Sequence, residues 1–452
     1  MGGKDGDISI SSESFFLDNG LIFSESGILI PSDDGSNVDL IGGKGNGGDI
    51  YMNIGSAEIS GGMISANTLG TGKAGNISIS GELLNIRDGA KIVADNGNIY
   101  IDEAGNIIDG TMIGGKGDSG NIALNVNQLE MHSASVSYNT LRSGTGGNVS
   151  ITAGDFVSIA GSGTDDAEHP ADFYHGVSTQ ARGTGNGGHI TIETDTLNLF
   201  TDAMINGQTY AEGQGGDVTL SINRLNVHEG GTVTTSSRGS GPAGDINIQA
   251  EDAVNLFGAG VKLGKSHIFT ATHSSGRSGD VTLSTRTLTL GENGLMSAES
   301  LGKGNAGNIR LNVSNTFRAD NAAVKTSAEQ ADGGDIFLNT KKRIYMTDSA
   351  LTTSVSDGQG NGGNITIDPE FVILNNTQIT ANAHGGTGGN ISIISEHYIR
   401  SAGSVVNASS ELGIDGSVYI ASPDEDATSG ITVLSDNFPD MRQKAIMRKL
   451  SA

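Results

Sequence analysis

Three aspartates stand at the same place in consecutive repeats of the chain, and their spacing is the closest approach to catalytic chemistry in the sequence. Asp217, Asp245 and Asp280 each follow a glycine and precede an aliphatic strand. If each repeat forms one turn of a solenoid, their carboxylates would stack about 5 Å apart, a separation that retaining glycosidases use. The same column also holds Asn308 and Asn390, which favours turn formers over catalysts. We therefore predict no catalytic residue.

The segment from Gly161 to His175 departs most sharply from the repeat. It contains several carboxylates and imidazoles, at Asp165, Asp166, Glu168, His169, Asp172, Tyr174 and His175. Such groups on one protruding loop could bind a divalent cation or another ligand. Histidines six residues apart are not a recognised metal spacing, so a solvated acidic loop is the simpler interpretation. We predict no metal site, and we take Asp165, Asp166, Glu168, His169, Tyr174 and His175 as a candidate ligand-contact loop.

A second irregular segment runs from Arg87 to Gly115. It mixes charged residues with short strands of its own, and the charged residues are Lys91, Asp95, Asp102, Glu103 and Asp109. We interpret it as an irregular turn with a side loop rather than as a site.

The element that must position all these residues is a repeat of about 27 residues. Each unit opens with a glycine-rich stretch, then an anchor residue, usually Asn or Asp, then alternating aliphatic residues. The regular anchors are His189, Asp217, Asp245, Asp280, Asn308, Asp335, Asn364, Asn390 and Ser417, and earlier ones are Asp7, Asp49, Asn76, Asn121 and Asn148. A fixed period of this length is typical of solenoids.

Aliphatic residues alternate with polar ones within each unit, as in Val218, Leu220, Leu225, Val227 and Val233. Period-two alternation predicts strands with one buried face, and no helical periodicity competes with it. The sequence therefore predicts an all-β, right-handed parallel β-helix of roughly 15 coils.

The turn residues agree with this architecture. The 70 glycines and only 6 prolines suit tight corners with positive φ and uninterrupted strand ladders. Asn and Asp at the anchors tolerate left-handed backbone, hydrogen-bond the chain two residues on, and can form a ladder when stacked. Small residues in the third strand of each unit predict one narrow corner.

The predicted organisation is a β-helix over residues 1–434, with insertions near 9–45, 87–115, 155–180 and 251–275, and a C-terminal cap or tail over 435–452. Pro439 suits the first turn of a helix, so the cap is expected to be helical. The chain starts in mid-repeat at Gly6-Asp7-Ile8, which indicates a fragment of a longer protein.

Composition narrows the possible partners. The formal net charge is −25, which disfavours nucleic acid and anionic lipid. There is no cysteine, hence no disulfide or thiolate-bound metal, and no apolar run suggests insertion into a membrane. Glycine-rich stretches such as Gly43 to Gly48 precede strands instead of opening helices, so no nucleotide or other cofactor is predicted.

The units from Gly362 to Ala383 and from Ala408 to Gly416 resemble the C-terminal repeats of filamentous haemagglutinin-like exoproteins, and the resemblance covers most of the chain to about residue 434. It implies a secreted or cell-surface location at the bacterial outer membrane, and export by a partner transporter that acts through an upstream secretion domain. That domain has no counterpart in this sequence. The resemblance also implies adhesion to a host-cell, matrix or surface receptor, either glycan or protein.

Three functional classes follow from the sequence. We favour the shaft of a secreted or surface-attached adhesin, a function without catalysis. A polysaccharide lyase or glycoside hydrolase is the first alternative, although the chain has no Trp and only 4% aromatic residues to stack on sugars. A structural spacer or S-layer-like component that binds nothing is the second alternative.

Overall fold

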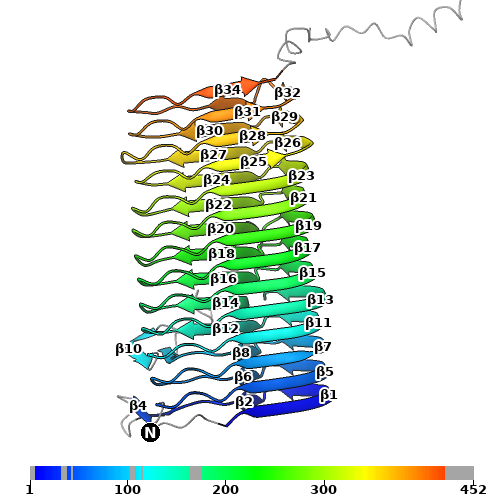
Figure 1. Ribbon diagram of the computed structural model, residues 1–452, viewed down its shortest axis with the longest axis vertical. Helices are drawn as coiled ribbons and strands as arrows, with labels where there is room; N and C mark the ends of the chain where they lie inside the picture. The colour runs from blue at the N-terminus through cyan, green and yellow to red at the C-terminus, as the bar shows by residue number, and fades with distance from the viewer. Residues whose placement is uncertain are drawn as a thin grey trace, which may run out of the picture.

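The structure is a computed structural model that describes residues 6–31, 38–41, 44–101, 107–113, 116–162 and 175–422 of the 452-residue chain. Within these residues all regular structure is β-strand, and the strands stack as the turns of a parallel β-helix (Figure 1). The predicted fold class is confirmed. The expected cap over 435–452 lies outside the described residues.

The first sheet contains 17 strands. Ten of them are long, and they are β1 (Ile8–Asp18), β5 (Ile50–Ser60), β7 (Ile77–Arg87), β11 (Ile122–His132), β13 (Val149–Ala160), β15 (Ile190–Phe200), β17 (Val218–His228), β19 (Ile246–Phe257), β21 (Val281–Gly291) and β23 (Ile309–Asp320). Toward the C-terminus each turn divides this strand, giving β25 (Ile336–Thr340), β26 (Arg343–Thr347), β28 (Ile365–Asp368), β29 (Phe371–Asn375), β31 (Ile391–Ile394), β32 (His397–Arg400) and β34 (Val418–Ala421). Because three turns are divided, the 17 strands make 14 turns.

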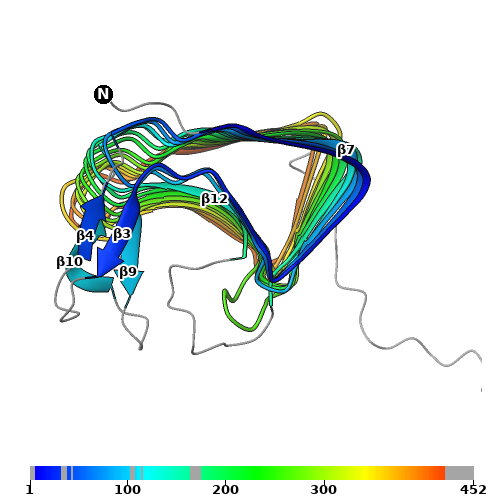
Figure 2. The same cartoon turned by 90° about the horizontal axis from the view of Figure 1, so that it is seen from below.

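The second sheet contains 13 shorter strands in the same parallel order. They are β2 (Leu21–Phe23), β6 (Met63–Ser65), β8 (Lys91–Val93), β12 (Ser135–Thr140), β14 (Gly176–Ala181), β16 (Met204–Thr209), β18 (Thr232–Ser237), β20 (His267–Thr272), β22 (Leu295–Ser300), β24 (Ala323–Ala328), β27 (Ala350–Val355), β30 (Gln378–Asn382) and β33 (Val405–Asn407). Seen along the axis, the long strands bend around one corner and form two sides of the cross-section, and the second sheet forms the third (Figure 2).

Two antiparallel hairpins interrupt the winding. They are formed by β3 (Ile28–Pro31) with β4 (Val38–Ile41), and by β9 (Asn98–Ile101) with β10 (Ile107–Ile113). Both follow a strand of the second sheet, and both project from the same edge of that sheet (Figure 2).

The core is built from columns of identical positions in successive turns. Ile190, Val218 and Ile246 pair in register on neighbouring strands, and each is fully buried. Since each such side chain contributes about 1.5–3 kcal/mol when buried, a narrow interior suffices for a rod of many turns. A turn buries its aliphatic residues only against its neighbours, so the stack is stable as a whole.

The anchor residues form a continuous hydrogen-bond ladder. The side chain of each anchor accepts a hydrogen bond from the backbone N–H of the next anchor, in thirteen successive steps from Asp7 to Ser417. The predicted ladder between stacked turns is present, whereas the described anchors do not form the predicted side-chain hydrogen bond to the backbone two residues on. The anchors also lack positive φ. Left-handed residues lie instead at the corner after the long strand, for example Asp88, Asn321 and Asn376.

Most glycines serve a different purpose from the one predicted. Only nine of the described glycines have positive φ. At Gly188, an added Cβ would lie 1.7 Å from the carbonyl oxygen of Gly147 one turn below and 2.5 Å from the Tyr138 hydroxyl. The glycine-rich stretch is therefore needed because the backbones of successive turns approach too closely for any side chain.

Candidate binding surface

The outward side of the second sheet differs from an ordinary solvent face. We call the outward-facing residues of β14, β16 and β18, together with the next outward residue beyond each strand, the lateral face; beyond the strands these are Arg182, Tyr210 and Arg238. Several of its polar side chains are almost fully buried, with exposures of 2% for Asn206, 5% for Gln208 and 3% for Thr234. Outward polar residues on a strand are normally solvated, so this surface requires a specific explanation.

Hydrogen bonds organise part of the lateral face. Gln208 Oε1 accepts from Asn206 Nδ2 at 3.3 Å and from the Tyr210 hydroxyl at 3.2 Å, and Gln180 Oε1 accepts from an Arg182 NH₂ group at 3.1 Å. These bonds fix the amide groups and orient the two larger side chains at the edge.

Three hydroxyl or amide oxygen atoms of the lateral face have no hydrogen-bond partner within the structure. They are Ser178 Oγ, Asn206 Oδ1 and Thr234 Oγ1, which lie on adjacent turns in one register column. A buried polar atom without a partner costs about 1–3 kcal/mol, and native structures leave few of them. All three atoms are shielded from solvent, so the column is a row of buried polar groups whose hydrogen-bonding capacity is not used within the structure.

An arginine–tyrosine–arginine stack marks the edge of this surface. The Arg182 guanidinium lies 4.4 Å from the centre of the Tyr210 ring, and the Arg238 guanidinium lies 5.4 Å from it. The three residues are spaced by 28 in the sequence and occupy equivalent positions in three turns. Cation–π contact and the bond from Arg182 to Gln180 hold the planar guanidinium groups in place.

The described insertions project from the margins of the second sheet at different heights along the rod. Hairpins β3–β4 and β9–β10 project from the edge where the strands of the second sheet end, while the loop 258–266 lies at the edge where they begin (Figure 2). Asp202 fastens this loop across two turns, because its carboxylate accepts the backbone N–H groups of Val261, Lys262 and Leu263 at 2.8–3.0 Å. The irregular parts of the chain thus gather on one side of the rod.

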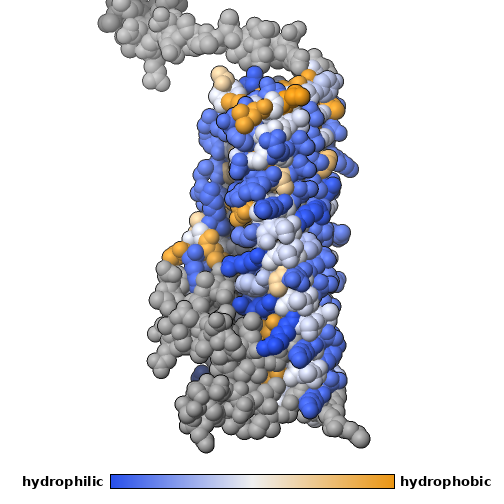
Figure 3. Space-filling view, turned by 90° about the vertical axis from the view of Figure 1, so that its left-hand side faces the viewer, coloured by the Kyte–Doolittle hydropathy of each residue, from blue (hydrophilic) through white to orange (hydrophobic). Residues whose placement is uncertain are grey.

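The narrow edge that carries the hairpins is largely hydrophilic in its described part (Figure 3). Apolar colour appears near the C-terminal end and on a projecting group at mid-height in this view. The described surface on this side is therefore mainly polar, with an exposed apolar residue, Val261, on the loop 258–266.

Of the candidate ligand-contact loop, the structure describes only His175. This partly buried residue immediately precedes β14, and its carbonyl oxygen accepts from the Met204 N–H at 2.9 Å. It lies at the opposite end of β14 from Arg182. Asp165, Asp166, Glu168, His169, Asp172 and Tyr174 lie outside the described residues.

The aspartate column is occupied by the ladder. Asp217 Oδ1 accepts from the Asp245 N–H and Asp245 Oδ1 from the Asp280 N–H, both at 2.8 Å. Burial, with the neighbouring carboxylates, raises the pKa of Asp245. Asp280 contacts both Arg277 and Arg310. One oxygen of each aspartate thus holds the next turn, as expected for turn formers.

In the irregular segment from Arg87 to Gly115, Asp95 joins a polar column on the outward side of the second sheet. The Asp95 N–H donates to Asn67 Oδ1 at 2.6 Å, and Asp95 Oδ1 accepts from the Asn139 N–H at 2.5 Å. Burial raises the pKa of Asp95 to about 7, against the opposing effect of these bonds from Asn139. Asp102 and Glu103 lie outside the described residues, and Asp109 is in β10.

A histidine ring on β20 is also buried. His267 stacks on Phe269 with ring centroids 4.2 Å apart, and its Nε2 lies 2.8 Å from Ser297 Oγ. Burial, with a smaller effect from Lys325 and Lys265, lowers the pKa of His267 to about 3. Ser297 is fully buried, so this pair does not present an accessible nucleophile.

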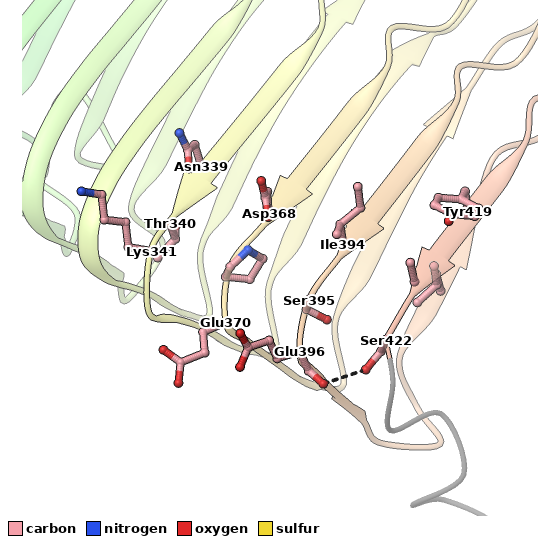
Figure 4. Close-up of a pocket in the computed structure, with 13 residues that line it drawn as sticks. Asn339, Thr340, Lys341, Asp368, Glu370, Ile394, Ser395, Glu396, Tyr419 and Ser422 are labelled. Atoms are coloured by element: carbon pink, nitrogen blue, oxygen red, sulfur yellow. Dashed lines mark hydrogen bonds between the residues drawn. The ribbon is translucent and has the colours of Figure 1, made fainter.

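A separate groove of about 800 Å³ crosses the C-terminal turns of the first sheet. Figure 4 shows Asn339, Asp368, Ile394 and Tyr419 in a row along one side of it, with Lys341, Glu370 and Glu396 beyond the bend. Glu370 and Glu396 lie on adjacent turns, since the Glu396 N–H donates to the Glu370 carbonyl at 3.1 Å. Glu370 is engaged by Lys342 at 3.1 Å. This groove is where a carbohydrate-cleaving activity would have to be sought.

Within the described ranges, no group of three or more His, Asp or Glu residues is arranged to hold a metal ion. The same part of the chain has no helix that could cross a membrane.

Fold and surface together define a parallel β-helical rod with one irregular polar face. Compared with known proteins, the chain matches no protein-family model, no curated protein and no solved structure.

The Arg182–Tyr210–Arg238 stack was not anticipated from the sequence. Its signal was present in the repeat itself, because large charged and aromatic residues occur at one offset in three consecutive units. Aligning the units by their anchors and searching each outward column for such residues would have found it.

Proposed function

We propose that this chain is the β-helical shaft of a secreted or surface-attached bacterial adhesin, similar to the filamentous haemagglutinin-like exoproteins, and that it binds its partner through the lateral face. The observation that carries the proposal is the gathering of irregular features on one side. Two hairpins and the loop 258–266 project from the margins of the second sheet, and several outward polar groups of that sheet are buried and partly unpartnered. Elsewhere the turns repeat regularly.

The rod is suited to such a role. The thirteen-step anchor ladder joins every turn to the next, so the partner-binding side is presented on a continuous scaffold. Repeated contacts along its length can act together, because linked weak sites gain affinity from effective concentration. In this proposal, a partner transporter at the outer membrane exports the protein through a secretion domain outside this chain.

The test is an adhesion assay with beads that carry the purified chain, presented to cells, matrix proteins and immobilised glycans. The decisive variant deletes residues 163–174. It leaves Gly161, Ser162 and His175 between β13 and β14, the same length as the connection of residues 201–203 between β15 and β16. A matched control, Thr219→Glu, alters an outward position on the first sheet.

We expect the deletion to reduce adhesion strongly and Thr219→Glu to leave it unchanged. Equal adhesion of the deletion variant and the intact chain would refute a role in adhesion for the candidate ligand-contact loop. Failure of the intact chain to adhere to any tested surface would refute the adhesin proposal and favour a spacer.

A further inference from the structure

We infer that the groove across the C-terminal turns of the first sheet binds the segment 439–450 of the same chain. The groove lies where the long strand of successive turns is divided into two, and the segment lies outside the described residues. The inference names the occupant of this groove and does not depend on the proposed function.

The groove contains acidic side chains without cationic partners. Asp368 and Glu396 are exposed, and among the residues that the structure describes neither carboxylate has an ion pair or a hydrogen bond. Glu370 is already paired with Lys342, and Lys341 lies at the far end of the groove from Tyr419 (Figure 4). A cationic ligand would therefore find two free carboxylates on adjacent turns.

Apolar side chains are exposed at the same end of the rod. Ile394 and Tyr419 line the groove and are 48% and 60% exposed. Half of the exposed large apolar residues in the described part of the chain fall between positions 394 and 419. An exposed apolar patch with a polar rim is typical of an interaction site. The ligand that fits this groove is both basic and apolar.

The segment 439–450 has this composition. It holds four of the 26 lysine and arginine residues of the chain, at Arg442, Lys444, Arg448 and Lys449. In the helix expected from the sequence, Ile446, Met447 and Leu450 would share one face, because residues three and four apart are neighbours. In a chain of net charge −25, this concentration of cations is attracted to exposed acids of its own rod.

The segment is also tethered beside the groove. Ser422, the last residue that the structure describes, lines the groove, and its hydroxyl donates to the Glu396 carbonyl oxygen at 3.2 Å (Figure 4). The connection 423–438 reaches at most about 50 Å when fully extended, which is more than a return to the groove requires. Tethering raises the effective concentration of the segment to the millimolar range.

Other occupants fit the groove less well. A second rod carries the same excess of acids, so two copies repel each other through their surfaces. The segment 439–450 of a second copy has the right chemistry but lacks the tether. A polysaccharide brings no cations for Asp368 and Glu396.

Disulfide trapping tests the inference, because the chain has no cysteine of its own. The test variant of the full chain carries Ile394→Cys and Ala445→Cys, and the matched control carries Glu193→Cys and Ala445→Cys. Glu193 is exposed and lies in the outward column of Asp368, six turns away. Non-reducing electrophoresis separates intramolecular from intermolecular products, and circular dichroism verifies that each variant is folded.

We expect the intramolecular disulfide to form about tenfold or more faster in the Ile394→Cys variant than in the Glu193→Cys control, because docking raises the effective concentration. Adding Arg448→Glu and Lys449→Glu to the test variant should slow its formation several-fold, since the charge attraction becomes repulsion. Adding Glu396→Lys instead should have the same direction of effect.

Equal rates in the test variant and the control would overturn the inference. Disulfide-linked dimers in place of the intramolecular product would also overturn it, because they would assign the groove to a second copy. Trapping that is unchanged by both charge reversals would show that the segment does not recognise the acids of the groove, and the inference would fail on that result as well.

Discussion

Asp217 Oδ1 accepts a hydrogen bond from the backbone N–H of Asp245, 28 residues later and one turn further along the rod, at 2.8 Å. The same relationship repeats at every anchor from Asp7 to Ser417. This hydrogen bond requires a short side chain with an acceptor atom at each anchor, and in most turns the acceptor is an oxygen. At His189 the acceptor is Nδ1, which lies 3.2 Å from the Asp217 nitrogen. The ladder therefore specifies the register between turns.

Interrupting the ladder should destabilise the rod. Asn364 Oδ1 accepts the Asn390 N–H at 2.9 Å, and Asn364 Nδ2 donates to Asp335 at 3.0 Å. We expect Asn364→Ala to cost about 1–2 kcal/mol in the free energy of unfolding, measured by urea denaturation. Asn364→Asp keeps the acceptor for Asn390 but replaces the donor to Asp335 by a second carboxylate, so we expect it to cost stability at pH 7 as well. An Asn364→Ala variant as stable as the intact chain would show that the ladder contributes little.

Asp202 should control the loop 258–266. Its carboxylate is buried and accepts three backbone N–H groups of that loop. In Asp202→Ala these bonds are lost, so we expect faster hydrogen exchange at residues 261–263 and faster tryptic cleavage after Lys262 and Lys265. Glu193→Ala, an exposed acid on the same turn, is the control. Unchanged exchange in Asp202→Ala would contradict the fastening role.

His267 should make stability fall in acid. Its folded pKa of about 3 lies below the ordinary 6.5, so the neutral form is favoured in the fold. Its contribution is complete above pH 6.5 and is lost as the pH falls toward 3, at up to about 1.4 kcal/mol per unit. We expect the change in unfolding free energy between pH 7 and pH 5 to differ by about 2 kcal/mol between His267→Gln and the intact chain. Parallel pH profiles would refute this prediction.

Asp95 should make the fold less stable as the pH rises, which is opposite to the effect of His267. Its folded pKa of about 7 exceeds the ordinary 3.8, so the protonated form is favoured in the fold, and stability is lost as the pH rises from about 4 to 7. Asp95→Asn keeps an acceptor for the Asn139 N–H without the buried charge. We expect it to raise the free energy of unfolding by about 2–4 kcal/mol at pH 7.5 and to have little effect at pH 4. An equal effect at both pH values would point to packing and not to ionisation.

The groove at Glu370 and Glu396 provides the test of the enzymatic alternative. We expect no new chain ends when the protein is incubated with polygalacturonate, heparin or dextran, because Glu370 is paired with Lys342 and the aspartate column is occupied by the ladder. Reducing-end assays measure this directly. Cleavage that disappears in Glu396→Gln would contradict the prediction and place an active site in the groove.

The sequence alone determined the architecture. A 27-residue period with alternating aliphatic residues is typical of a parallel β-helix, in which each turn buries its apolar side against the next. The positions of Val218 and Ile246 in the repeat therefore predict both that they lie in strands and that they are buried. The anchor residues were also recognisable, because a short polar residue at one offset in successive turns must stack.

Only the tertiary structure decided which side of the rod is unusual. Arg182, Tyr210 and Arg238 lie 28 residues apart, and they become neighbours only when three turns stack in register. Likewise, the hydrogen bond from the Val261 N–H to Asp202 spans two turns, and no local sequence pattern predicts it. The glycines were read as turn formers, whereas Gly188 is needed because the backbone of Gly147 lies against it. Local chemistry specifies a strand and its buried face, but contacts between turns depend on the winding of the whole chain.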